Sequence, residues 1–186
     1  MSQSDEIGIS REALANALKT FELSMDSNQR SYAWERENAR ELFQDLQKAI
    51  DDDESEYFLG SIVVTRSDGH VVDGQQRLAT TSILLAAMRD YCLENNDPAR
   101  ADEIERTYLF SRSFRTQEIA PRLSLGKRDH DFYTKRVLSR PGDPERNTEP
   151  DKTEIPIGAF WKLLKRRARE WSRLRLLSVQ SKGPAS

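Results

Sequence analysis

The chain has 186 residues, of which 37% are hydrophobic and 32% are charged, and its formal net charge is −2. This composition is typical of a soluble protein with enough apolar residues for a core. Its longest apolar stretch, residues 82–88, is far shorter than a membrane span, and residues 1–6 lack the features of a secretory signal. We therefore expect a cytoplasmic protein without a membrane segment. A single cysteine, Cys92, excludes a disulfide within the chain and is interpreted as a small buried hydrophobe.

The first sixty residues show the pattern of two helices. Ser10 can cap a short helix whose apolar residues recur at helical spacing up to Phe21, and residues 24–32 are expected to form a loop. A second helix is expected after Trp34, with one apolar face and an end in the acidic run 51–56.

A β-hairpin followed by a buried helix is the most regular pattern in the chain. Residues 57–65 and 70–72 have the composition of strands, and Asp68-Gly69 between them supplies the positive-φ pair of a tight turn. The Asp-Gly pair at 73–74 then ends the second strand. Residues 75–93 are apolar on nearly every side, which predicts a helix inside the core.

Further helices and one strand are expected between residues 98 and 138. Pro98 can open a helix, residues 122–125 alternate like a strand, and Asp129 can cap another helix. With the preceding elements they are expected to form one compact core over residues 1–138.

The C-terminal part differs in composition. Residues 139–156 combine prolines with Gly142 and charged residues, which is typical of a flexible linker. Residues 157–180 predict a basic amphipathic helix, and residues 181–186 a disordered tail. The helix contains arginines that can contact the phosphates of a nucleic acid: Arg166, Arg167, Arg169 and Arg173. A solvated basic face is the alternative interpretation of the same residues.

Several types of site are excluded because the chain lacks their motifs. The chain lacks the glycine-rich phosphate loop, the Rossmann turn and any Cys-x-x-Cys pair. It has only two histidines, His70 and His130, and these cannot form a histidine-metal nuclease centre by themselves.

The turn at residues 73–77 has the outline of a phosphate site. Gly74 lets the backbone approach a ligand, the N–H groups at a helix start favour an anion, and Arg77 adds a positive charge. The amides of Gln75 and Gln76 can orient a water or a sugar hydroxyl, and Asp73 can hold a metal ion or accept a proton. The alternative is a plain turn in which Asp73 caps the helix and Arg77 is a surface charge.

Two blocks of the sequence add a more specific signal. Residues 58–64 read FLGSIVV and residues 71–81 read VVDGQQRLATT, and an earlier block at 29–34 reads QRSYAW. This combination resembles the GmrS-like N-terminal domain of GmrSD-type restriction systems, and residues 122–132 resemble a weaker third block. Asn28 stands where that family usually has an aromatic residue.

The resemblance implies a ParB- and sulfiredoxin-like α+β fold, with a small mixed sheet, a β-hairpin, a buried helix and a C-terminal helical appendage. It also implies a site that binds and often hydrolyses a nucleoside triphosphate, with Mg²⁺ as a candidate cofactor at Asp73. The residues that carry the catalytic motif are Asp73, Gln75, Gln76 and Arg77. The residues that match nucleotide-binding positions are Gln29, Arg30, Gly74 and Arg77. Trp34 is interpreted as a core residue.

The leading hypothesis is a nucleotide-binding, nucleotide-hydrolysing regulatory or sensor domain of a modification-dependent DNA restriction system. Nothing in the chain resembles a nuclease, so DNA cleavage is expected to need a nuclease subunit or a C-terminal domain outside this sequence. The alternatives are a non-enzymatic DNA-binding module that uses the basic helix, or a module that docks a nuclease through Trp161 and Trp171.

Overall fold

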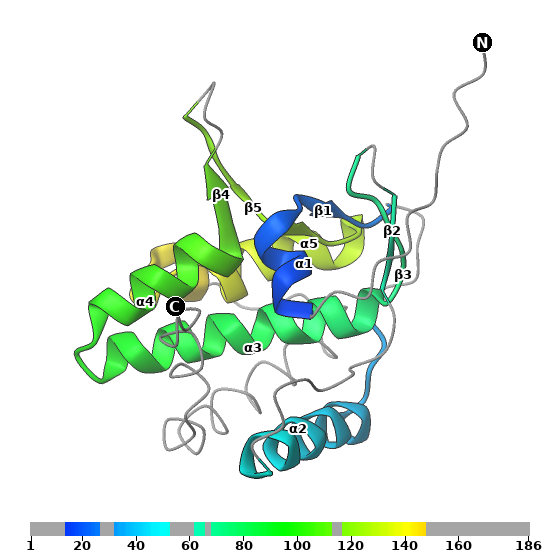
Figure 1. Ribbon diagram of the computed structural model, residues 1–186. Helices are drawn as coiled ribbons and strands as arrows, with labels where there is room; N and C mark the ends of the chain where they lie inside the picture. The colour runs from blue at the N-terminus through cyan, green and yellow to red at the C-terminus, as the bar shows by residue number, and fades with distance from the viewer. Residues whose placement is uncertain (1–13, 27–31, 53–61, 66–67, 113–116, 148–186) are drawn as a thin grey trace, which may run out of the picture.

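The computed structural model describes residues 14–26, 32–52, 62–65, 68–112 and 117–147 (Figure 1). These residues combine helices with short strands, which confirms the expected α+β class. The predictions for Gln29, for Arg30 and for the basic helix lie outside the described residues.

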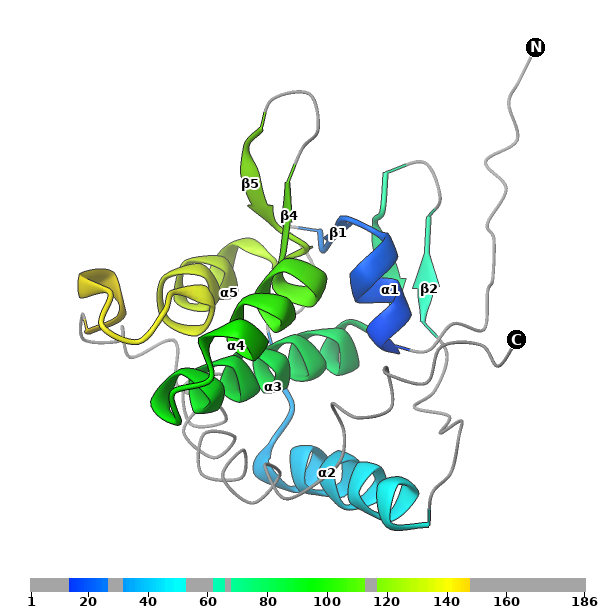
Figure 2. The same cartoon turned by 60° about the vertical axis from the view of Figure 1, so that its left-hand side comes forward.

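Helices supply most of the framework. In chain order they are α1 (Leu14–Thr20), α2 (Arg36–Asp51), α3 (Gln75–Glu94), α4 (Pro98–Ile104), η1 (Glu105–Leu109), α5 (Lys127–Phe132), η2 (Tyr133–Leu138) and η3 (Pro144–Asn147). η1 and η2 are π-helical turns that continue α4 and α5, and η3 is a 3-10 turn. Figures 1 and 2 show α3 in the middle, with α1 and α4 on one side and α2 on the other.

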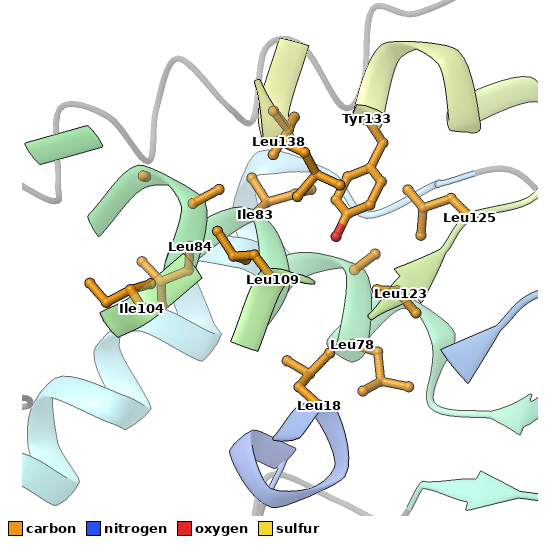
Figure 3. Close-up of a cluster of buried hydrophobic side chains, with 14 of the residues drawn as sticks. Leu18, Leu78, Ile83, Leu84, Ile104, Leu109, Leu123, Leu125, Tyr133 and Leu138 are labelled. Atoms are coloured by element: carbon orange, nitrogen blue, oxygen red, sulfur yellow. The ribbon is translucent and has the colours of Figure 1, made fainter. Parts of the chain in front are cut away.

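α3 is the central helix because it is apolar on almost every side. Eleven of its twenty residues are buried and only Glu94, at its end, is exposed, so other elements cover most of its surface. Its side chains Leu78 and Ile83 pack among residues from α1, η1, β6 (Leu123–Ser124) and η2 (Figure 3). Cys92 is buried in the same helix, and burial raises the pKa of its thiol. Both the buried helix and the interpretation of Cys92 are confirmed.

The described strands pair as three two-stranded ladders. β1 (Leu23–Ser24) is parallel to β6, whereas β2 (Val63–Val64) with β3 (Val71–Asp73) and β4 (Phe110–Arg112) with β5 (Ile119–Pro121) are antiparallel pairs. A parallel bridge between Ser24 and His70 connects β1 to the β2–β3 hairpin. Parallel and antiparallel pairing therefore meet in one small mixed arrangement beside the N-terminal end of α3 (Figure 1).

The β2–β3 hairpin depends on a glycine at its turn. Gly69 has a φ of +68°, and a Cβ atom at this position would lie 2.0 Å from the carbonyl oxygen of Glu22. The N–H of Ser24 donates to the carbonyl of Gly69 at 3.0 Å, so the turn packs directly against β1. Gly69 has the positive φ predicted for the second residue of the Asp-Gly pair, and close packing requires the same glycine.

Two helix starts test the predicted caps. α4 begins at Pro98, as predicted, and the side chain of Asp97 caps it by accepting the N–H of Arg100 at 3.1 Å. α5 instead has Gly126 at its N-cap position, and Asp129 lies inside the helix. The prediction that Asp129 caps this helix is wrong, because its carboxylate accepts the N–H of Tyr32 at 2.7 Å.

A buried arginine holds the C-terminal half of α3 in place. Arg89 is 0% exposed, and its guanidinium donates to the carboxylates of Asp90 and Glu105 at 3.0 and 2.9 Å. It also donates to three consecutive carbonyls at the end of η2, those of residues 137, 138 and 139, at 2.6 to 3.0 Å. A buried charge is tolerated only when it is paired and hydrogen-bonded, and Arg89 meets both conditions.

The same network continues into the segment expected to be a linker. Arg146 is 9% exposed in its side chain, pairs with Asp90 and donates to the carbonyl of Ser139 at 2.9 Å. Arg140 pairs with Glu105 and with Asp102. The expected linker, residues 139–156, is described only up to Asn147, and in this part it is anchored to the core. The domain boundary stays a prediction.

Arg89→Met should lower the free energy of unfolding by about 3 to 5 kcal/mol, because it leaves buried carboxylate and carbonyl oxygens without their donor. The matched control is Arg100→Met, whose side chain is 54% exposed and pairs with Asp97 at 3.4 Å. It should cost no more than about 1 kcal/mol. Urea denaturation of the three proteins measures both values, and equal costs would contradict the role given to Arg89.

Candidate functional site

A cavity of about 310 Å³ opens at the N-terminal end of α3. Among the described residues, its lining consists of Trp34 and one short run of sequence, Val72, Asp73, Gly74, Gln75, Gln76 and Arg77. Trp34 belongs to the segment before α2, and the run contains the end of β3 and the first turn of α3. The two sequence blocks that carry the predicted site therefore meet at one cavity.

The turn between β3 and α3 is made by a glycine in a left-handed conformation. Gly74 has φ 89° and ψ 10°, is buried, and occupies the N-cap position of α3. The interpretation of Asp73 as the helix cap is therefore wrong, and Asp73 is instead the exposed last residue of β3. The N–H of Leu78 donates to the carbonyl of Gly74 at 3.1 Å, so the N–H groups of residues 75–77 form the positive end of the helix beside the cavity.

Gln76 connects the two blocks directly. Its side-chain Oε1 accepts the N–H of Ala33 at 2.9 Å and the N–H of Trp34 at 3.3 Å. Gln75 uses its amide nitrogen differently and donates to the carbonyl of Val71 at 3.3 Å. Both glutamines of the predicted catalytic motif thus also hold backbone, a role that the sequence alone did not indicate.

The charged residues of the cavity have opposite signs. Asp73 is exposed and Arg77 is half-buried, and both line the cavity. In the described part of the chain no group of three or more His, Cys, Asp or Glu side chains is arranged to hold a metal ion. Among the described residues that line the cavity, Asp73 carries the only carboxylate.

Tyr32 fixes the other side of the segment that carries Trp34. Its hydroxyl shares a 2.9 Å hydrogen bond with Thr80 of α3, and its N–H donates to Asp129 of α5. A second, much smaller cavity beside Tyr32 and Asp129 is also lined by Gln75 and Gln76. Burial raises the pKa of the Asp129 carboxyl, while the Tyr32 N–H and the Arg128 charge oppose that shift.

The remaining predicted site residues lie outside the described residues. They are Gln29 and Arg30 of the nucleotide-binding set and Arg166, Arg167, Arg169 and Arg173 of the basic helix. Trp34 was expected to be a core residue, and it does pack against the core, but it also forms a wall of the cavity. The QRSYAW block, of which Trp34 is the last residue, is the sequence signal that could have indicated this second role.

Asp129→Asn should stabilise the protein increasingly as the pH rises. The pKa of Asp129 is raised in the folded state, so its contribution to stability is full below the ordinary aspartate pKa and is lost as the pH rises through the raised value. Asparagine keeps an oxygen for the Tyr32 N–H and does not ionise.

Urea denaturation over a pH series across that window gives the difference between variant and wild type. Asp131→Asn, at an exposed position of the same helix, controls for the loss of one negative charge. If the difference in unfolding free energy between Asp129→Asn and the wild type did not grow with pH, the raised pKa of Asp129 would be contradicted.

Comparison with known families places this site in context. The family described as GmrSD restriction endonuclease, N-terminal domain, matches residues 12–178, which is 167 of the 186 residues. The comparison with curated proteins gave no match. No helix in the described residues has the length and apolar character needed to cross a membrane. The family match includes both blocks and every residue that lines the cavity, so the chain belongs to the family of GmrSD restriction endonuclease N-terminal domains.

Proposed function

We propose that the cavity at the start of α3 binds a nucleoside triphosphate, and that the chain hydrolyses it as a regulatory or sensor domain of a modification-dependent restriction system. The observation that carries this proposal is the turn from β3 through Gly74 into α3, with Arg77 in the same cavity. The proposal includes a ParB- and sulfiredoxin-like core, which the mixed strand pairing around α3 supports.

The phosphates would lie against Gly74 and the first turn of α3. Left-handed Gly74 has no side chain to block them, and the N–H groups of residues 75–77 attract an anion. Arg77 would neutralise the charge that develops on the transferred phosphoryl group. A cavity of about 310 Å³ is within the range that small-molecule sites occupy.

Mg²⁺ fits this arrangement through Asp73. The ion usually binds proteins through one or two carboxylates and takes further oxygens from phosphates and water, and Asp73 supplies one exposed carboxylate at the cavity. When bound, it would neutralise phosphate charge. Within the described residues Gln75 Oε1 and Gln76 Nε2 make no hydrogen bond, so these atoms can orient the attacking water.

The proposed role in restriction requires a nuclease. We propose that this domain controls a nuclease subunit or a further domain, which cuts modified foreign DNA in the cytoplasm according to the nucleotide state. DNA would be reached directly or through that partner. Contact of DNA with the arginines of the expected basic helix stays a prediction, and such contact would make DNA affinity fall steeply with salt.

Arg77→Ala should weaken nucleotide binding by about 1.5 to 3 kcal/mol, the range for a lost charge-assisted hydrogen bond. Arg106→Ala, at an exposed position of η1 outside the cavity lining, is the matched control and should bind as the wild type does. A thermal-shift panel of ATP, GTP, CTP and UTP with Mg²⁺ selects the nucleotide, and calorimetric titration then measures affinity. Unchanged affinity in Arg77→Ala would return residues 73–77 to the interpretation of a plain turn.

A further inference from the structure

Trp34 lies between the core and the cavity. Its indole is half-buried, packs against the hydrophobic core and also lines the cavity of residues 72–77. Part of the indole therefore faces the cavity and not the core. The other described residues of the lining are a valine, a glycine, polar amides and two opposite charges, so among the described residues Trp34 alone offers this cavity an aromatic ring.

We propose that Trp34 stacks on the base of the bound nucleotide, an inference that rests on the proposed function. Gly74, the helix start and Arg77 suit the phosphates, and none of them offers an apolar surface to a flat heterocycle. An indole does, and stacking on it tolerates any base because every base has a π-face. The ligand of the cavity is then a nucleotide in particular, since a polyphosphate has no base that could stack on the indole of Trp34.

The segment that carries the indole is held in place before any ligand arrives. Gln76 Oε1 accepts the N–H groups of both Ala33 and Trp34, and Tyr32 is tied to Thr80 and to Asp129. Gln76 also belongs to the helical turn that carries Arg77. Gln76 is therefore a positioning residue, which sets the distance between the indole of Trp34 and the first turn of α3, where the phosphates would lie. Such preorganisation avoids the entropy cost of ordering the segment on binding.

The test compares nucleotide with inorganic tripolyphosphate, both with Mg²⁺, by calorimetric titration. ATP, GTP, CTP and UTP are each titrated, and tripolyphosphate is the probe without a base. Trp34→Ala should weaken nucleotide binding by about tenfold and leave tripolyphosphate binding unchanged. Arg77→Ala should weaken both ligands.

Two further variants separate stacking from packing. Trp34→Leu keeps an apolar side chain against the core but has no π-face, so it should behave as Trp34→Ala does and remain folded. Trp34→Phe should retain most of the nucleotide affinity. If all three Trp34 variants bound nucleotide as the wild type does, or lost both ligands equally, stacking would be overturned while phosphate binding by Arg77 would stand.

The positioning role of Gln76 has its own readout, which is the ratio of nucleotide affinity to tripolyphosphate affinity. Gln76→Leu removes the acceptor for two N–H groups, so this ratio should fall. Gln76→Glu keeps an acceptor oxygen and should restore the ratio, although its charge lowers both affinities. If the ratio were the same in both variants and in the wild type, the positioning role of Gln76 would be overturned. A wild-type protein that bound neither ligand would instead overturn the proposed function itself.

Discussion

The arrangement of the helices depends on the hydrogen bonds of one buried group, the guanidinium of Arg89. It is fully removed from solvent, and its five N–H groups are directed at two carboxylates and at the last carbonyls of η2. Because helix ends leave carbonyls without partners, η2 can end inside the protein only where such a donor exists. Arg89 therefore fixes where η2 ends on α3, and through η2 it fixes the direction of α5.

This constraint reaches the site at the opposite end of α3. α5 is continuous with η2, and its first turns carry Asp129 to the N–H of Tyr32. Tyr32 lies two residues before Trp34, and Gln76 accepts the N–H groups of Ala33 and Trp34. The cavity is thus lined by two segments, and α5 holds the one that carries Trp34 through the hydrogen bond from Tyr32 to Asp129. A charged cluster at one end of the helix and a polar turn at the other are parts of one framework.

Local patterns in the sequence predicted those elements whose cause is local. The Asp-Gly turn, the apolar run of α3 and the glycine after β3 each follow from backbone conformation or hydrophobic periodicity within a few residues. Arg89 and Asp90 were missed because a hydrophobic pattern treats charges as exposed, whereas these two are buried through partners up to 50 and 56 residues away. Asp129 was assigned to a local cap because its partner, the N–H of Tyr32, is 97 residues away in the chain. In the site, the run 73–77 was predicted, but the hydrogen bonds that attach it to Ala33 and Trp34 cannot be read from either block alone.

The pairing of β1 with β6 has a consequence for how this protein is made. Leu23 is the partner of Leu123, and Tyr32 and Asp129 are 97 residues apart in the chain. When the ribosome has released the first half of the sequence, β1 and the segment of Trp34 still lack the strand and the carboxylate that hold them. Long-range parallel pairing of this kind forms slowly, and apolar surface stays exposed until it does. The emerging chain therefore contains the whole run 73–77 well before it contains Asp129, and the cavity can reach its final form only after residue 129 has been synthesised.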